Sequence, residues 1–403
     1  MPKILVLVAF SLRLAWLLAS QPKAVSDFLT YRRLAFGLVE HGQLGYPDPT
    51  AGRLPGYPAF LALFAAISEN DVWLGLSSVL LSTALVPLTH LLMRRLGADA
   101  KLALFAAALV AFNPTFVLSA PLLASEHLST PLVLGAILLA LKSDPAKPPW
   151  PALAAGLLLG GAALTRGDTL FYILVLGFIV AREGSVRPRA SASAALLLGA
   201  VLCLAPWYAR NRIVVGPGTG LSTTSGFNFY AAHNARGYGW SSAKKRLQKI
   251  KDPVVQNQRG WRLGFDHVKK THVVGLAKSV ATGTEKLYFH PPDYAVKWST
   301  KKSSTGAERL QPPLEVLLSV YYYLLLLLAV LAYRWWRSAK PVLALGSAVV
   351  LINWFTFAVL FWGKPRYRYV GEVLLCLMAA VTLDELFAWL QTKRSAKPGE
   401  APS

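Results

Sequence analysis

Residues 313–333, PLEVLLSVYYYLLLLLAVLAY, are apolar along almost their whole length. A helix of this length rises about 30 Å, the thickness of the hydrocarbon core of a bilayer. Further apolar blocks lie at 4–19, 72–93, 102–120, 190–209 and 341–362. Of the 403 residues, 54% are apolar and 15% are charged, which excludes a disordered chain and an ordinary soluble protein. The sequence therefore predicts an integral membrane protein.

The distribution of basic residues orients the chain in the membrane. Lysine and arginine number 42 against 20 aspartate and glutamate, and the net charge of +22 would suggest nucleic-acid binding in a soluble protein. Here the basic residues of the short loops recur after every second apolar block, which is typical of cytoplasmic loops, so we expect no nucleic-acid partner. Both termini are then expected in the cytoplasm. The basic positions are Arg94, Arg95, Lys101, Lys142, Lys147, Arg182, Arg187, Arg189, Arg334, Arg337, Lys340, Lys393, Arg394 and Lys397.

This charge bias predicts an all-α polytopic membrane protein with about ten transmembrane helices. The first span has a second interpretation as a cleaved signal peptide, but Arg13 in its middle argues against cleavage. The spans lie at roughly 4–20, 72–93, 102–120, 123–142, 151–166, 168–182, 190–209, 313–333, 341–362 and 367–390. The expected organisation is an N-terminal transmembrane catalytic module at 1–209 with a folded outer loop at 21–71, an extracytoplasmic segment at 210–312, C-terminal transmembrane helices at 313–392 and a disordered cytoplasmic tail at 393–403.

Segment 210–312 is the longest hydrophilic stretch of the chain. It carries 18 Lys/Arg against 5 Asp/Glu, which does not overturn the topology because long segments cross the membrane largely regardless of charge. Within it, residues 261–288 place apolar side chains at helical spacing with the lysines largely elsewhere, which predicts an interfacial amphipathic helix. The two cysteines, Cys203 and Cys376, lie inside predicted spans and cannot build a disulfide framework or a thiolate metal site.

The first outer loop carries the leading catalytic candidate, Asp27. It follows Ser26 directly outside the first span, at the start of a predicted helix for which Ser26 is the expected N-cap. Asp27 either stabilises the helix dipole or acts as a reacting carboxylate. The loop continues through Arg53-Leu54-Pro55-Gly56-Tyr57-Pro58, a rigid turn that folds it back towards the bilayer.

Other ionisable residues are expected at the outer ends of spans, where such groups are functional candidates by default. Glu126 and Asp168 are the acidic ones. The basic turn at 364–368 is unfavourable on the outer side, so a bound phosphate would explain it, and snorkelling towards lipid headgroups is the alternative. The cations expected on this side are Arg53, Arg166, Arg210, Arg212, Lys364, Arg366 and Arg368.

Several motifs, taken in their order along the chain, resemble the GT-C glycosyltransferases. They are Asp27 after the first span, Arg53 before Pro-Gly-Tyr-Pro, Ser125-Glu126 opening the fourth span, Leu-Thr-Arg at 164–166, Pro-Trp-Tyr-Ala-Arg-Asn at 206–211 and Arg-Tyr-Arg-Tyr at 366–369. More narrowly, residues 1–389 are similar to the bacterial branch related to protein O-mannosyltransferases and to the lipid A aminoarabinose transferase. The resemblance implies a polyprenyl-phosphate-linked sugar donor, a glycan, lipid or protein acceptor, and inverting transfer on the extracytoplasmic face of the inner (plasma) membrane.

The resemblance also implies roles for particular residues. Asp27 matches the catalytic acidic residue of the family, Glu126 a second acidic position, and Arg53 a basic residue that holds the donor phosphate. Two departures are that Phe28 stands where many relatives carry a second acidic residue, and that no large soluble domain follows the last span, which leaves acceptor recognition to segment 210–312. The remaining candidates are Arg210, Lys364, Arg366 and Arg368 for the donor phosphate, and Tyr57, Arg166, Asp168 and Trp207 for the substrate pocket.

Elementary chemistry agrees with this implication. If fixed cations neutralise a departing polyprenyl phosphate, the acceptor hydroxyl needs one base, and Asp27 is the expected one. Asp27 and Glu126 together would also satisfy a hydrolase, and they leave a loosely held divalent cation open as a cofactor. The aromatic candidates for stacking on sugar or isoprenoid, or for an interfacial belt, are Tyr57, Trp207, Tyr208 and residues 227–230.

Two rival functions stay open beside the transferase. One is a transporter or flippase of lipid-linked sugars, which often shows paired repeats that are not visible in this sequence. The other is a glycan polymerase or ligase that uses the same donors. The sequence has no GxxxxGK[ST] loop, which makes nucleotide hydrolysis by a P-loop unexpected.

Overall fold

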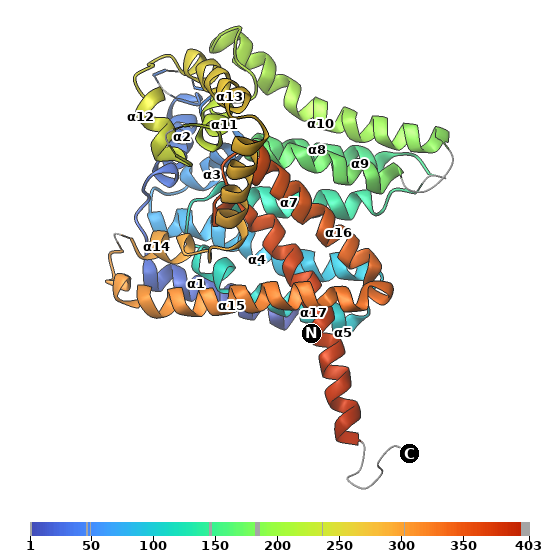
Figure 1. Ribbon diagram of the computed structural model, residues 1–403. Coiled ribbons are helices and arrows are strands. Elements are labelled where there is room, and N and C mark those ends of the chain that lie inside the picture. The colour runs from blue at the N-terminus through green and yellow to red at the C-terminus, as the bar shows by residue number, and fades with distance from the viewer. Residues whose placement is uncertain are drawn as a thin grey trace.

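The computed structural model describes residues 2–45, 47–48, 50–144, 147–181, 186–235, 237–301 and 303–395. These residues form helices and turns without a β-strand (Figure 1). Five of the helical stretches are long and apolar enough to cross a membrane by length and composition, and shorter apolar helices accompany them. The predicted all-α polytopic membrane architecture is therefore confirmed.

Each of the ten predicted spans coincides with a helical stretch. Gly156 and Gly199 let two of these, α8 and α10, come close together, since a Cβ at Gly156 would lie 2.0 Å from the Leu196 carbonyl oxygen. The stretches are α1 (Pro2–Ser20), α4 (Asp71–Arg95), α5 (Ala100–Phe112) with α6 (Pro114–Leu118), α7 (Ser125–Ala140), α8 (Trp150–Thr165), η1 (Gly167–Tyr172) with α9 (Ile173–Ala181), α10 (Val186–Val214), α15 (Gln311–Leu331), α16 (Trp336–Trp354) with η4 (Phe355–Leu360), and α17 (Tyr369–Ser395).

The third predicted span is broken rather than continuous. Pro114 has no amide hydrogen to continue α5, and the side chain of Asn113 instead accepts a hydrogen bond from the Thr115 amide at 2.8 Å. Arg13 of α1, fully buried, donates to the Val110 and Ala111 carbonyl oxygens at 3.1 and 3.0 Å, which are left free at the end of α5. The mid-span arginine thus stabilises the break and ties α1 into the bundle.

The elements between the spans gather towards one end of the bundle in Figure 1. In the first outer loop α2 packs on α3, and in the later segment α11 packs on α13. These outer elements are α2 (Asp27–His41), α3 (Gly56–Ala65), α11 (Ser225–Ala232), α12 (Trp240–Leu247), α13 (Pro253–Tyr288), α14 (Tyr294–Thr300), η2 (Ala307–Leu310) and η5 (Pro365–Arg368), while η3 (Ala332–Trp335) joins α15 to α16.

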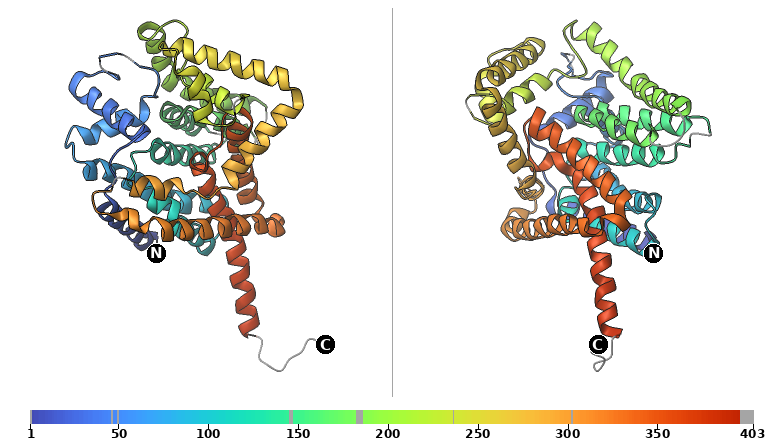
Figure 2. Two further views of the ribbon diagram at one scale, coloured as in Figure 1. Left: turned by 60° about the vertical axis from the view of Figure 1, so that its left-hand side comes forward. Right: turned by 45° about the vertical axis from the view of Figure 1, so that its right-hand side comes forward.

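Two predicted boundaries need correction. The amphipathic helix begins at Pro253 rather than at residue 261, because the Asp252 side chain caps it by accepting from the Val254 amide at 2.7 Å. It also bends sharply at His272, which has a φ of 52°, and its two arms form a corner in the left view of Figure 2. At the other end of the chain α17 continues to Ser395, so the first residues of the predicted disordered tail are helical. Residues 396–403 of that tail, and Arg182 among the predicted loop cations, lie outside the described residues.

Candidate active site

Asp27 is the first residue of α2 and faces a cluster of charged side chains. Ser26 stands at the N-cap position as predicted, but it has a φ of 53° and its side chain makes no capping hydrogen bond. The helix is held instead by packing, with the Tyr31 ring against the Tyr57 ring of α3 at a centroid distance of 5.1 Å. Asp27 and Tyr31 are one turn apart, so both point to the same side of α2.

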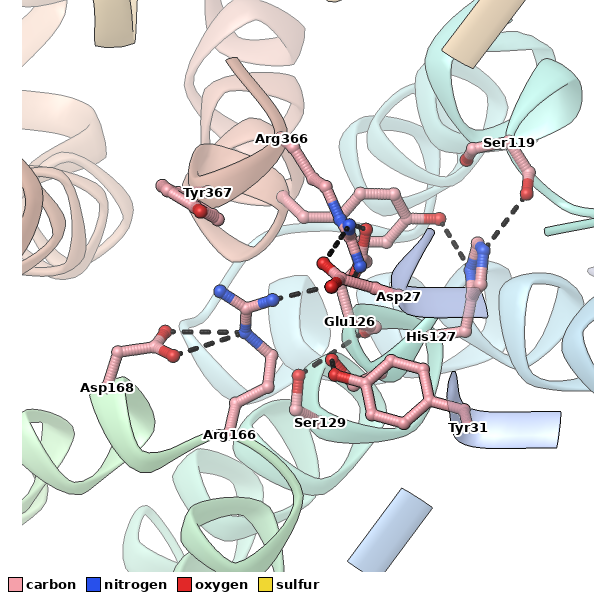
Figure 3. Close-up of polar contacts among 12 residues, drawn as sticks. Asp27, Tyr31, Ser119, Glu126, His127, Ser129, Arg166, Asp168, Arg366 and Tyr367 are labelled. Carbon is pink, nitrogen blue, oxygen red and sulfur yellow. Dashed lines mark hydrogen bonds and ion pairs between the residues drawn. The ribbon is translucent and has the colours of Figure 1, made fainter. Parts of the chain in front are cut away.

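Two guanidinium groups hold the Asp27 carboxylate. Arg53 Nη2 lies 2.5 Å from Oδ1. Arg366 Nη1 lies 3.4 Å from Oδ2 (Figure 3). The side chain of Asp27 nevertheless keeps 41% of its surface exposed. Burial raises the pKa of Asp27, but the charges of Arg366 and Arg53 outweigh that effect and place the pKa below its ordinary value. Asp27 is therefore ionised at neutral pH, in the form that accepts a proton.

Glu126, at the start of α7, is the second carboxylate of the cluster and is only 2% exposed. Arg366 donates two hydrogen bonds to it, from Nε to Oε1 at 2.5 Å and from Nη2 to Oε2 at 3.0 Å. Arg166 Nη1 adds a third contact at 3.4 Å, and its Nε pairs with Asp168 at 3.2 Å. Arg366 thus bridges the two carboxylates, and Glu126 is already fully engaged.

The beginning of α7 is fixed by its next residue, His127. Its Nε2 donates to the Ser119 carbonyl oxygen at 3.0 Å (Figure 3). Nδ1 therefore accepts from the Tyr369 hydroxyl at 3.1 Å. His127 is completely buried. The backbone that carries Glu126 is therefore anchored to both α6 and α17.

The charges of the cluster balance. The predicted reason for the basic turn at 364–368 was a bound phosphate. The pairing of Arg366 with two carboxylates is a different reason for a cation at this position. Lys364 lies at the surface, with its ammonium 4.2 Å from the centre of the Trp362 ring. The three negative residues are Asp27, Glu126 and Asp168, and the three positive ones are Arg53, Arg166 and Arg366.

Close packing brings the first outer loop to the end of α8. A Cβ at Gly56 would lie 2.5 Å from the Thr165 hydroxyl oxygen, so glycine is required for this approach. The contact brings the loop that carries Arg53 to the end of α8, where Arg166 follows, and both arginines line one cavity although they are far apart in sequence. The Pro-Gly-Tyr-Pro motif is thus a docking element for the loop.

The cluster faces a cavity of about 880 Å³. We call its two main surfaces the charged wall and the apolar wall. The charged wall consists of Asp27, Arg53, Arg166, Asp168 and Arg366. The apolar wall consists of Leu170, Phe171, Ile173, Leu174, Phe357 and Phe361, from η1, α9, η4 and the residue that follows η4. The cavity is large enough for a small-molecule headgroup together with part of an apolar chain.

Two predicted site residues of α10 stand behind the cavity rather than in its lining. Arg210 Nη1 donates to the Thr50 carbonyl oxygen at 3.0 Å and ties α10 to the first outer loop. Trp207 Nε1 donates to the Leu221 carbonyl oxygen at 2.9 Å. Both therefore support elements that do line the cavity.

Two further predicted residues are buried within the protein. Arg368 is fully buried and donates to the Leu287 and His290 carbonyl oxygens at 2.5 and 2.7 Å, which joins the end of α13 to η5. Tyr57, also fully buried, shares a 3.0 Å hydrogen bond with Ser78. Neither lines the cavity.

Sequence reasoning missed two groups of lining residues. Tyr31 lines the cavity, and its spacing of four residues from Asp27 on one helix was the available signal. Residues 220–228 also contribute. They contain the polar run Ser222-Thr223-Thr224-Ser225, which carries no catalytic motif. Their position depends on tertiary contacts, which local sequence does not show.

The arrangement does not fit a divalent cation between Asp27 and Glu126. The Arg366 guanidinium already pairs with both carboxylates, where a metal ion would need their free oxygens. The described residues also contain no group of three or more His, Cys, Asp or Glu side chains suited to a metal ion. We derive no chemical step through such an ion.

Known proteins share this architecture. The family model for dolichyl-phosphate-mannose-protein mannosyltransferases matches residues 49–209. The archaeal oligosaccharyltransferase AglB from Archaeoglobus fulgidus, in complex with an inhibitory peptide and a dolichol-phosphate, is similar with a TM-score of 0.55 and 13% identity, over 100% of this chain and 52% of that one. The chain has the GT-C fold. This confirms the predicted resemblance to the GT-C superfamily at the level of the fold.

Other comparisons complete the picture. The Archaeoglobus fulgidus oligosaccharyltransferase in complex with Zn and sulfate gives a TM-score of 0.56 at 15% identity, over 97% of this chain and 50% of that one. ArnT from Cupriavidus metallidurans, bound to undecaprenyl phosphate, gives a TM-score of 0.47 at 14% identity, over 100% and 81% of the two chains. No curated protein sequence is significantly similar to the chain. The chain spans about half the length of the oligosaccharyltransferases, as the coverage of 52% states.

Proposed function

We propose that this GT-C protein transfers a sugar from a polyprenyl-phosphate-linked donor to an acceptor hydroxyl, with inversion and with Asp27 as the general base. One observation carries the proposal: a partly exposed, ionised carboxylate lies between two arginines in a cavity that also has an apolar wall. A sugar phosphate on an isoprenoid chain combines the same charged and apolar parts. The structural neighbour AglB, whose solved complex contains a dolichol-phosphate, supports a donor of this class.

Arg53 is the best placed group for the donor phosphate. Its Nε is buried without a hydrogen-bond partner among the described residues, and its Nη1 makes only a 3.4 Å contact to the adjacent Gly52 carbonyl oxygen. Arg53 therefore has unused donors beside the one that binds Asp27. Arg366 is more fully committed, because each of its three nitrogens already contacts a carboxylate. We assign phosphate binding to Arg53 and positioning of Asp27 to Arg366.

The apolar wall suits the isoprenoid chain. Leu174 of α9 lines the cavity and is 61% exposed. In a membrane this exposed side chain contacts lipid, so the cavity and the bilayer share a border at α9. When the phosphate of a donor is bound at the charged wall, its isoprenoid chain can lie along this border.

In the proposed step one bond forms and one bond breaks at the anomeric carbon of the sugar. The acceptor oxygen forms a bond to the anomeric carbon while the bond from that carbon to the phosphate oxygen breaks. The hydroxyl proton moves to Asp27, and the polyprenyl phosphate leaves with the electron pair and a negative charge that Arg53 stabilises. Attack from the face opposite the leaving phosphate inverts the anomeric configuration. Release of the proton to water restores the Asp27 carboxylate.

The reaction is proposed for the extracytoplasmic face of the inner membrane, where the charge bias places 21–71 and 210–312. Cysteine labelling tests this after Cys203 is replaced by serine. We expect a cysteine at exposed Lys251 to react with an impermeant reagent from outside and one at exposed Lys142 to react only from the cytoplasm. Asn234, in the same outer segment, is buried and is a poor labelling site. The reverse pattern would overturn the proposed sidedness.

Reconstituted liposomes separate the transferase from a flippase. With an undecaprenyl-phosphate-linked sugar as donor and a mixture of cell-envelope glycans, lipids and peptides as acceptors, a transferase releases undecaprenyl phosphate, which mass spectrometry detects. A flippase moves the intact donor between leaflets and leaves the sugar-phosphate bond unbroken. Relocation of intact donor without any release of undecaprenyl phosphate would contradict the proposal. A polymerase or ligase differs only in the acceptor that becomes labelled.

A further inference from the structure

A third surface of the cavity carries no charge. It is formed by residues 220–228 and by Asn257 and Trp261 of α13, and we call it the amide wall. Ser222, Thr224, Ser225 and Asn228 face the cavity from the first of these elements. The general-base mechanism above uses none of them.

The amide wall is held rigidly from behind. Asn211 Nδ2 donates to the Gly220 and Leu221 carbonyl oxygens at 3.0 and 3.2 Å. The Thr223 amide donates to the Ala51 carbonyl oxygen at 3.1 Å, which attaches the segment to the same loop that carries Arg53. The amide wall is therefore joined directly to the loop that contributes Arg53 to the charged wall.

Two side-chain amides of the amide wall are bonded within the protein through their oxygen only. Asn228 Oδ1 accepts from Trp362 Nε1 at 3.2 Å, and Asn257 Oδ1 accepts from the Gly226 amide at 2.6 Å. In each case the oxygen is committed within the protein, and the NH₂ group has no partner among the described residues. These bonds fix which end of each amide is free. Both amides therefore offer donors to a ligand.

Hydroxyl and indole groups complete this surface. Ser222 and Thr224 share a 2.8 Å hydrogen bond, which leaves the O–H of one of the two hydroxyls free to donate. Trp261 is fixed by stacking on Phe229 at 4.6 Å and by its Nε1 bond to Ser225 at 3.2 Å. Oriented amides, hydroxyls and a rigid indole match the alternating hydroxyl and C–H groups of a sugar ring. An isoprenoid would leave the amides unpaired, and an ionised group would find no counter-charge here.

We propose that the amide wall binds a neutral carbohydrate. This rests on the proposed function, which brings either the donor's sugar or a glycan acceptor into the cavity. Both sources present the same hydroxyl groups. The free NH₂ group of Asn228 is the donor that we assign to one of these hydroxyls.

Saturation-transfer NMR on the full chain in lipid nanodiscs tests the proposal, with methyl glycosides of glucose, galactose and mannose as probes. Asn228→Asp keeps an oxygen for Trp362 Nε1 but removes the free donor, so we expect binding to weaken about threefold to tenfold, the effect of one lost hydrogen bond. Ser222→Ala is a second variant that leaves both amides intact and should weaken binding less. Asn70→Asp is the matched control, because Asn70 lies outside the cavity as the N-cap of α4, a position that aspartate also fills well.

Competition distinguishes the two sources of carbohydrate. A methyl glycoside that displaces undecaprenyl-phosphate-glucose but not bare undecaprenyl phosphate occupies the position of the donor's sugar. One that displaces neither occupies an acceptor position, and both results support the proposal. Binding that is absent, or equal in wild type, Asn228→Asp and Ser222→Ala, would overturn it. If the same preparation still binds undecaprenyl phosphate through Arg53, the proposed donor site survives that failure.

Discussion

The two carboxylates that share Arg366 lie in contrasting surroundings. Asp27, in the first turn of a loop helix, keeps 41% of its side chain exposed to the cavity and has one contact from each of two arginines. Glu126, in the first turn of a bundle helix, is 2% exposed and takes two short hydrogen bonds from Arg366 and a longer one from Arg166. The exposed group can exchange a partner for a substrate, whereas the buried one can only hold its partners in place.

The difference arises from what carries each residue. The backbone at Glu126 is fixed by His127 between α6 and α17, so its carboxylate stays where the bundle puts it. Asp27 depends on the packing of α2 against α3 and on Arg53 from the following turn. We therefore expect changes at Asp27 to affect the reaction and changes at Glu126 to affect the structure around it.

The largest expected effect is that of Asp27→Asn on the rate of sugar transfer. Asparagine keeps the shape of the side chain and a hydrogen-bonding oxygen but cannot take the acceptor proton. We expect transfer to be at least about a hundredfold slower, a loss of about 2.7 kcal/mol or more in transition-state stabilisation. Folding and binding of undecaprenyl phosphate should be retained, and initial rates of undecaprenyl phosphate release measure the effect.

Asp71→Asn provides a matched control for that experiment. Asp71 also stands in the first turn of a helix and pairs with an arginine, Arg32, at 3.0 Å, yet it lies outside the large cavity. Its replacement should leave the rate nearly unchanged. Turnover by Asp27→Asn close to that of wild type would return Asp27 to the role of stabilising the helix dipole and make Glu126 the better candidate for the base.

The next largest effect concerns donor affinity in Arg53→Ala. The loss of a charge-assisted hydrogen bond to phosphate costs about 1.5–3 kcal/mol, so undecaprenyl phosphate should bind about 10- to 100-fold more weakly. Arg53→Lys should recover part of this affinity, because the charge returns without the second donor of the guanidinium fork. Arg32→Ala, which removes an arginine from the surface pair with Asp71, is the control. Equal binding by Arg53→Ala and wild type would remove Arg53 from the phosphate site.

Glu126→Gln should change stability more than chemistry. Glutamine leaves Arg366 and Arg166 buried with less compensating charge, and breaking a buried pair costs on the order of 3 kcal/mol. We expect a lower apparent melting temperature and a loss of transfer activity of less than about tenfold. Glu285→Gln, at an exposed carboxylate paired with His290, should change neither quantity. A loss of activity in Glu126→Gln as large as that in Asp27→Asn, with an unchanged melting temperature, would contradict the division of roles.

The fold was predictable to a large degree because the bilayer constrains helix length and loop charge. Each expected span has its helix. The site was predictable in part: Asp27, Arg53, Glu126, Arg166, Asp168 and Arg366 do come together.

What the sequence did not predict depends on contacts between distant segments. Arg368 differs from Arg366 by two positions but faces the end of α13 instead of the cavity. Nothing local in Tyr367-Arg368-Tyr369 shows this, because the turn at Pro365–Arg368 is a short 3₁₀ helix whose orientation is set by its neighbours. The amide wall likewise exists only because α10, α13 and the first outer loop converge on residues 220–228.

The smallest expected effect, and the one most sensitive to the surroundings of Asp27, is on the pH dependence of kcat/KM. Transfer needs Asp27 deprotonated, and its arginine partners hold the pKa below the ordinary value of about 3.9, so the rate should stay level as the pH falls from 7 to about 5. In two variants the acid limb of the pH–rate profile should move in opposite directions. Arg53→Ala removes a charge that lowers the pKa of Asp27 and should shift the limb to higher pH. Glu126→Gln removes a negative charge that raises this pKa and should shift the limb to lower pH. Initial rates between pH 4 and 8, with stability checked at each pH, measure both shifts. Shifts of the same sign in the two variants, or a wild-type limb near the ordinary histidine pKa of about 6.5, would show that a group other than Asp27 accepts the proton.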